Sequence, residues 1–167
     1  IVEHHGGRIQ EFKGDSLLAV WDAHDAKAAK QALNAAQDMQ LSINQGLLQT
    51  HAPVGLEPLA IGIGIEQGPV LVGSIGPAHR RTHTMLGDTV AITLRIQEMT
   101  AELAFPVLLG ECIARQLNDL DLQSQGSYLL SGLTVPHVLY APQQSEPDEA
   151  PNDKNQPILK LLRGGRS

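Results

Sequence analysis

Apolar and small residues alternate along residues 59–65 in the manner of a β-strand. Aliphatic residues occupy the odd positions of this range, and its even positions hold only alanine and glycine. A repeat of two residues places these two sets on opposite faces of a strand. One face is therefore lined by small residues, and we expect another segment to approach it closely. Gly68-Pro69 then predicts a tight turn into a second strand over residues 70–72, paired with the first as a hairpin.

The N-terminal part of the chain contains another pair of predicted strands. Residues 8–12 have a strand pattern, residues 13–15 have turn composition, and residues 17–21 form a continuous apolar run. Such a run suits a strand that is buried on both faces. We therefore predict a hairpin whose tip carries the acidic Asp15. Residues 1–7 have the composition of a helix end that stops at glycine, so we expect a further segment to precede them.

Helical periodicity is found in two longer segments. Residues 23–48 are rich in Ala, Leu and Gln and contain no proline, which predicts the longest helix of the chain. Residues 88–104 have the same period and end before Pro106, which disfavours the helical conformation in the residue preceding it. A short helix is predicted over residues 110–117.

Shorter segments complete the expected architecture. Loops are predicted at 50–58 and at 73–84, and the second of these carries Arg80 and Arg81, which we interpret as solvated. Further strands are predicted at 107–109, 128–130 and 138–140. Hairpins mixed with helices predict an α+β fold, in which helices cover a sheet with antiparallel pairs.

Composition and charge narrow the class of protein. The chain has 167 residues, of which 42% are hydrophobic and 3% aromatic, and its formal net charge is -6. These values suit one domain with an aliphatic core, which we place at residues 1–141, followed by a polar linker or tail at 142–167. An acidic chain without a basic stripe argues against a nucleic-acid partner.

The setting of the chain follows from its cysteine content and its apolar runs. Cys112 is the only cysteine, so no disulfide within the chain is possible and we expect a cytoplasmic location, with Cys112 itself small and buried. No apolar stretch approaches the roughly 18 residues of a membrane span, so this segment is expected to make no direct membrane contact. A cytoplasmic part of a larger, membrane-anchored protein fits the same pattern.

Two glycine-rich segments stand out jointly. The first runs from Gly6-Gly7 through Gly14-Asp15 to Trp21, and the second from Ile61 through Gly73-Ser-Ile-Gly76 to Gly87-Asp88-Thr89-Val90. In their order and spacing they resemble the catalytic domain of the class III nucleotidyl cyclases, the adenylyl and guanylyl cyclases. The resemblance covers about residues 1–141. It implies a ferredoxin-like core and the cyclisation of ATP or GTP to a cyclic 3′,5′-nucleotide and pyrophosphate, in a signalling protein.

The resemblance also implies roles for two charged residues. In this family two aspartates hold two Mg²⁺ or Mn²⁺ ions; Asp15 matches the second, and the first lies on a strand that would precede residue 1. Without the resemblance, Gly14-Asp15 is a turn former. Arg95 matches the arginine that binds the triphosphate across a head-to-tail homodimer interface, and a solvated helix-face arginine is the alternative.

Four further positions bear on substrate and rate. Ala91 stands where the family has an asparagine that orients the ribose, so a hydrogen-bond donor is lost. Glu11 and Thr84 stand at the base-selecting positions; Glu suits guanine and Thr belongs to the ATP-using branch, which leaves ATP and GTP both open. Ser131 replaces a lysine that often binds phosphate. As an alternative, Glu11 is a solvent-facing strand residue.

Two functions are therefore predicted side by side. The first is a nucleotidyl cyclase, and the second is a catalytically inactive cyclase-like module that dimerises, binds nucleotide and relays a signal. Other classes of site are disfavoured: no Walker A sequence occurs, the glycine spacing of 62–68 does not fit a dinucleotide fingerprint, and the histidines are scattered without metal-ligand spacing.

Overall fold

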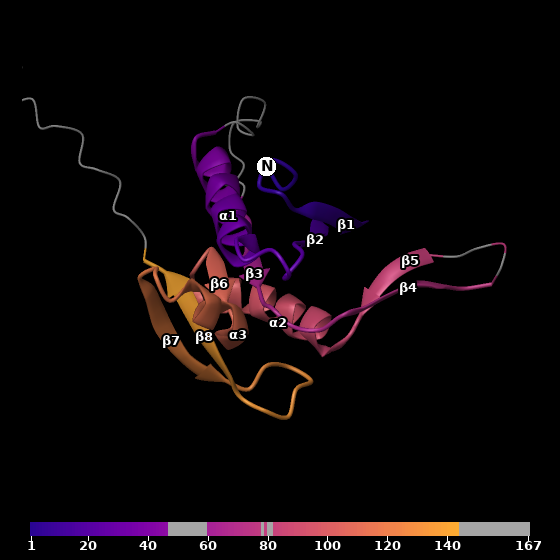
Figure 1. The fold of residues 1–167 in the computed structure, drawn as a ribbon. Helices are drawn as coiled ribbons and strands as arrows, with labels where there is room; N and C mark the ends of the chain where they lie inside the picture. Colours follow the sequence, from indigo (N-terminus) through magenta and orange to yellow (C-terminus); the bar gives the residue numbers. More distant parts are fainter. Residues whose placement is uncertain (47–59, 78, 80–81, 144–167) are drawn as a thin grey trace, which may run out of the picture.

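The computed structural model describes residues 1–46, 60–77, 79 and 82–143 (Figure 1). Its strands and helices follow in the order β1 (Arg8–Lys13), β2 (Ser16–Val20), α1 (Ala28–Asn44), β3 (Ile63–Ile65), β4 (Leu71–Ile75), β5 (Thr82–Leu86), α2 (Asp88–Leu103), β6 (Val107–Leu109), α3 (Glu111–Ala114), the 3-10 helix η1 (Arg115–Leu117), β7 (Leu122–Tyr128) and β8 (His137–Pro142). The chain is α+β, as predicted.

The central sheet has four strands in the order β3-β6-β8-β7, whereas β1-β2 and β4-β5 form separate two-stranded sheets. Strands β3 and β6 run parallel, and the remaining pairs are antiparallel. Figure 1 shows the β4-β5 ribbon extending away from the body of the molecule.

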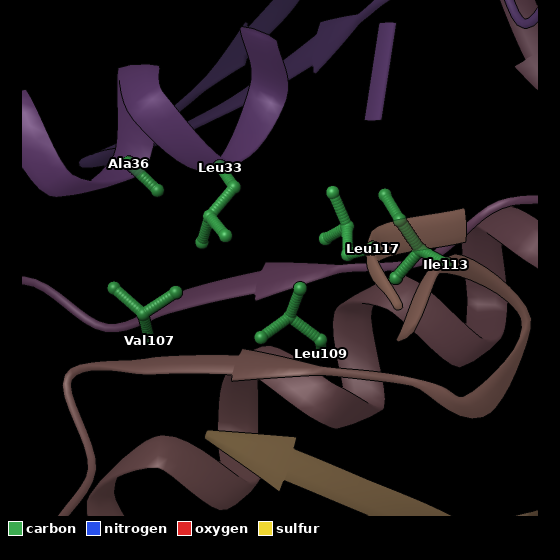
Figure 2. Packing of buried hydrophobic residues seen from close by; sticks show 6 residues of the cluster. All are labelled: Leu33, Ala36, Val107, Leu109, Ile113 and Leu117. Carbon is green, nitrogen blue, oxygen red and sulfur yellow. The ribbon is translucent and has the colours of Figure 1, made fainter. Parts of the chain in front are cut away.

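The alternating side chains of β6 divide the core into two parts. Val107 and Leu109 pack with α1, α3 and η1, and Figure 2 shows this cluster of Leu33, Ala36, Val107, Leu109, Ile113 and Leu117. Leu108 points to the other side, where it joins Ile96 of α2 and Leu139 of β8. Successive residues of a strand face opposite ways, so α1 and α2 cover opposite faces of β6.

The small face of the glycine-rich strand receives α2, as predicted. A Cβ atom on Gly64 would lie 2.5 Å from the backbone nitrogen of Gln97 and 2.7 Å from the carbonyl oxygen of Thr93. Only glycine tolerates such a close approach of backbone to backbone. The strand is shorter than expected, however, and begins at Ile63.

The predicted hairpin between residues 59–65 and 70–72 is wrong. Strand β3 pairs with β6 in parallel, from Ile63 opposite Val107 to Ile65 opposite Leu109, and β4 pairs with β5 instead. The Thr89 hydroxyl donates a hydrogen bond of 2.8 Å to the carbonyl oxygen of Pro69. This hydrogen bond holds the segment after β3 against the first turn of α2, so the chain does not turn back to pair with β3.

The predicted polar loop 73–84 is largely a ribbon. Strand β4 continues to Ile75 and β5 begins at Thr82. Arg80 and Arg81 lie outside the described residues, as does the predicted loop 50–58. Strand β7 ends at Tyr128, where a strand over 128–130 was expected to begin.

Helix α1 begins later than its composition predicts. The carboxylates of Asp22 and Asp25 accept hydrogen bonds from the backbone N–H groups of His24 and Lys27, at 3.0 and 2.9 Å. Such local bonds favour turns over helix, and the helix therefore starts at Ala28. It ends before Gly46, which has a φ of 73°.

The N-terminal hairpin exists as predicted, but its apolar strand is not buried on both faces. Among the strands that the structure describes, β2 pairs only with β1, and Phe12 is 70% exposed while Leu17 is 45% exposed. Trp21 anchors the base of the hairpin, because its indole N–H donates a bond of 2.9 Å to the carbonyl oxygen of His5. Residues 2–6 form turns, with the His5 N–H bonded to the Ile1 carbonyl as in a helix end.

Candidate functional site

Asp15 lies at the exposed tip of the β1-β2 hairpin. Gly14 takes a left-handed φ of 61°, which glycine adopts without strain, and the Ser16 hydroxyl donates 2.8 Å to the carbonyl oxygen of Lys13. Among the described residues, the Asp15 carboxylate has no hydrogen bond or ion pair. It is therefore free to bind a cation.

The chemistry of this carboxylate suits a hard divalent cation, which prefers oxygen ligands. The described part of the chain holds no group of three or more His, Cys, Asp or Glu residues that could bind a metal ion. Asp15 would thus supply one ligand, and further ligands must come from elsewhere. His4, His24 and His79 are exposed, as predicted, whereas His5 and His137 are half-buried.

The start of helix α2 is held in place by two threonines. Thr89 bonds to Pro69, and the Thr93 hydroxyl donates 2.7 Å to the carbonyl oxygen of Thr89. The first bond ties the start of α2 to the chain that leaves β3, and the second lies within the helix. Ala91 is exposed on this part of the helix, and Arg95 follows one turn later on the same face.

Arg95 is paired with an acidic neighbour on its own helix. Its Nη1 group donates to both carboxylate oxygens of Glu98, at 2.7 and 2.8 Å. The two side chains are 40% and 52% exposed. These hydrogen bonds raise the pKa of Arg95, so the guanidinium is charged at every physiological pH. Sequence reasoning identified Arg95 but missed this partner, although an Arg-x-x-Glu spacing on a helix could have revealed it.

The remaining predicted residues lie on three different elements. Glu11 is exposed on β1, opposite Leu18 of β2. Thr84 is half-buried on β5 and pairs with Gly73. Ser131 is exposed in the connection from β7 to β8.

Within one copy of the chain these groups are not joined. Over the described ranges, no hydrogen bond or ion pair links the β1-β2 hairpin, with Asp15 and Glu11, to α2 or to Ser131. The structure leaves Asp15 and Arg95 accessible on separate elements. One chain therefore presents parts of a site rather than a closed pocket.

Sequence reasoning overlooked a half-buried acid, Glu66, which follows β3 directly. One of its oxygens accepts hydrogen bonds from the backbone N–H groups of Gln67 and Ile113, at 2.7 and 3.1 Å. Burial raises the pKa of Glu66, and the two N–H bonds and His137 oppose the shift. The position of an acidic residue immediately after an apolar strand is the sequence signal that could have identified Glu66. Glu66 fastens α3 to the end of β3 and lies apart from the predicted site.

The raised pKa of Glu66 predicts a pH-dependent stability. The folded chain binds this proton more tightly than the unfolded chain, so the contribution is full below the unfolded pKa near 4.5 and is lost as the pH rises through the folded value. We expect Glu66→Gln to gain stability relative to the wild type as the pH increases from about 4.5 to 7. Thermal melts across this range measure the difference, with exposed Glu3→Gln as the control. Parallel curves for wild type and Glu66→Gln would contradict this expectation.

Cys112 is exposed on α3, so the expectation that it is buried was wrong. The buried residues of this short helix are Ile113 and Ala114 instead. The negative charge of Glu66, followed by burial, raises the pKa of the Cys112 thiol, which disfavours the reactive thiolate.

Across the helices that the structure describes, none has the length and apolar character that crossing a bilayer requires.

Comparison with known proteins places these features in a family. A sequence profile of the adenylate and guanylate cyclase catalytic domain matches residues 1–140. The chain is 30% identical over 122 residues to adenylate cyclase 1 of Rhizobium meliloti (strain 1021), an alignment that covers 72% of this chain and 18% of that protein.

Two solved structures are similar to the fold. The adenylyl cyclase CyaB from P. aeruginosa superposes with a TM-score of 0.74 at 22% identity, covering 89% of this chain and 78% of that one. The guanylyl cyclase Cya2 superposes with a TM-score of 0.68 at 29% identity, covering 89% and 76%. The chain spans less than a quarter of the length of the curated relatives it matches first.

Proposed function

Because the chain belongs to the family of adenylate and guanylate cyclase catalytic domains, we propose that it is a nucleotidyl cyclase domain of a signalling protein. Its reaction converts ATP or GTP to the cyclic 3′,5′-nucleotide and pyrophosphate. The observation that carries the proposal is the family match over residues 1–140, within which Asp15 and Arg95 are both accessible. We place the reaction in the cytoplasm.

The proposed reaction makes one bond and breaks one bond at phosphorus. The ribose 3′-oxygen bonds to the α-phosphorus and loses its proton, while the bond from the α-phosphorus to the pyrophosphate oxygen breaks. Negative charge increases on the phosphate oxygens during this exchange, so cationic groups aimed at them supply most of the rate. In this account Arg95 binds the triphosphate through its guanidinium, which suits phosphate oxygens.

Asp15 would hold a divalent cation, Mg²⁺ or Mn²⁺. Its carboxylate is exposed at a turn and is a hard oxygen donor of the kind these ions prefer. When bound, such an ion neutralises charge on the phosphate oxygens. Catalytic domains of this family use divalent metal ions, and the proposal assigns Asp15 as one ligand.

The proposed active unit is a head-to-tail homodimer, in which Asp15 of one copy faces Arg95 of the other. Two observations support this arrangement. The described residues of one chain do not link the two groups, and the β4-β5 ribbon with its approach exposes Val70, Leu71, Val72, Ile75 and Leu86. Exposed large apolar side chains gathered on one ribbon are typical of protein interfaces.

The base of the nucleotide would meet Glu11 and Thr84, with Ser131 near the phosphates. A glutamate accepts hydrogen bonds from guanine, whereas the relatives described above include both adenylyl and guanylyl cyclases. The proposal therefore names the substrate as ATP or GTP, and the assay below decides between them. No partner of the nucleic-acid class is proposed.

One observation favours the second function, a nucleotide-binding module without turnover. Ala91 is exposed one turn before Arg95, and a methyl group there donates no hydrogen bond to the ribose. Loss of one such donor reduces the rate by about 10² to 10³. If the chain is an enzyme, its turnover is therefore slow. If it is the regulatory module, it binds the nucleotide without converting it.

The test of the proposed function is a direct assay of the full-length protein. ATP and GTP are supplied separately with Mn²⁺, and the amounts of cyclic nucleotide and of pyrophosphate formed are measured. The proposed reaction produces the two in equal amounts. We expect a slow formation of one cyclic nucleotide that depends on the metal. Nucleotide binding without any product would favour the regulatory module, and neither binding nor product would overturn both functions.

A further inference from the structure

We propose that Glu98 is a built-in competitor for the Arg95 guanidinium and weakens the binding of triphosphates until it is displaced. This inference rests on the proposed function, because it concerns the phosphate-binding half of that site. It assigns a new role, a positioning residue on α2 that tunes affinity without touching the reacting atoms. The ligand class is any polyphosphate that carries terminal phosphate oxygens.

The geometry explains why the competition is direct. A guanidinium presents its N–H groups in a planar fork that suits either a carboxylate or a phosphate. In the free chain both Glu98 oxygens already accept from Arg95 Nη1, at 2.7 and 2.8 Å. A phosphate that approaches Arg95 therefore meets a guanidinium whose Nη1 group already donates to Glu98 and whose positive charge is balanced by the Glu98 carboxylate.

The same geometry explains why a phosphate can displace the Glu98 carboxylate from Arg95. Both side chains are about half exposed, 40% for Arg95 and 52% for Glu98, and exposed pairs shift an equilibrium by a factor of about five at most. Only Nη1 is engaged by Glu98, so a phosphate has the rest of the fork to bind first and then replaces the carboxylate stepwise. The pair thus lowers affinity without blocking the site.

Charge adds to this effect. Glu98 lies within contact distance of Arg95, and a triphosphate carries several negative charges, so the two anions repel each other at close range. Glu102 lies one further turn along the same helix and is exposed. In the described structure Glu102 forms no hydrogen bond or ion pair, which makes it a matched control on the same helix with the same charge.

The experiment compares Glu98→Gln with Glu102→Gln in the full-length protein. The Kd values for ATP, for GTP and for inorganic tripolyphosphate are measured by calorimetry at low ionic strength in the presence of Mg²⁺. We expect Glu98→Gln to tighten binding of ATP or GTP and of tripolyphosphate about threefold to tenfold. Glu102→Gln is expected to change these values by less than about twofold, because screening weakens more distant charges.

A double-mutant cycle separates competition from a general charge effect. In an Arg95→Gln background, Glu98→Gln should give no more than about half of its gain, because there is no guanidinium to release. Circular dichroism melts check that α2 is intact in each variant.

The outcomes divide cleanly. If wild type and Glu98→Gln bind ATP, GTP and tripolyphosphate equally, the inference is overturned whatever the cyclase assay shows. If neither chain binds any of the three, the inference is overturned as well. Tighter binding by Glu98→Gln, together with absence of cyclic nucleotide, would support the inference while refuting turnover.

Discussion

Replacement of Asp15 by asparagine is expected to reduce cyclic nucleotide formation by about a thousandfold or more. The amide has nearly the same shape as the carboxylate but carries no charge, and hard divalent cations depend on anionic oxygen ligands. Asp15 is exposed and takes no part in the hydrogen bonds of the hairpin. The loss should therefore appear in the rate and in the metal requirement, and the melting temperature should be nearly unchanged.

The measurement is initial rate against Mn²⁺ concentration for the wild type, Asp15→Asn and the control Asp121→Asn. Asp121 is exposed, and its backbone carbonyl rather than its side chain accepts the N–H of Gln143. We expect Asp121→Asn to match the wild type and Asp15→Asn to recover part of its rate at high Mn²⁺. A rate for Asp15→Asn within tenfold of the wild type would remove Asp15 from the proposed metal site.

The second large effect is a gain. We expect Ala91→Asn to raise kcat at least about tenfold, since one well-placed donor contributes about 10² to 10³ to such reactions. Ala91 is exposed one turn before Arg95, so a longer side chain fits without displacing the core. KM should change little, because the new bond is strongest when the ribose oxygen reacts.

A matched control accompanies this variant. Ala101 is exposed on the same helix, and Ala101→Asn has the same helix-propensity cost of roughly 0.7 kcal/mol at a position outside the proposed site. We expect no gain in rate from Ala101→Asn. An unchanged kcat for Ala91→Asn would show that the missing donor is not what limits the reaction.

One long periodic segment and one tight turn were predictable from the sequence. Helix α2 appears within one residue of its predicted range, because its apolar period is sustained and Pro106 follows its end. The hairpin tip at Asp15 appears where Gly14 allows a left-handed turn. The close approach at Gly64 was predictable because small residues occupied one whole face of a strand.

Pairings between distant segments were not predictable in the same way. The parallel partner of β3 is β6, more than forty residues later, and nothing local to residues 61–65 specifies it. The apolar run of β2 was expected to be buried on both faces, yet Leu17 is exposed because β1 is the single partner of β2 among the described strands. Burial depends on which elements surround a strand, and local composition does not encode that.

The candidate site divides along similar lines. Asp15, Ala91 and Arg95 were proposed as site residues from motif spacing that resembles that of the family. Glu66 was missed because its partner Ile113 is distant in the sequence. The engagement of Arg95 by Glu98 depends on side-chain conformation, which spacing permits but does not determine.

The central claim is that Asp15 and Arg95 meet between two copies of the chain, and subunit complementation tests it most directly. Asp15→Asn and Arg95→Gln are co-expressed in equal amounts, and the rate of the mixture is compared with that of each variant alone. Random pairing makes half of the dimers mixed, each with one intact site, so the account predicts about a quarter of the wild-type rate. A mixture no more active than the two inactive variants measured separately, with mixed dimers confirmed by mass, would contradict it.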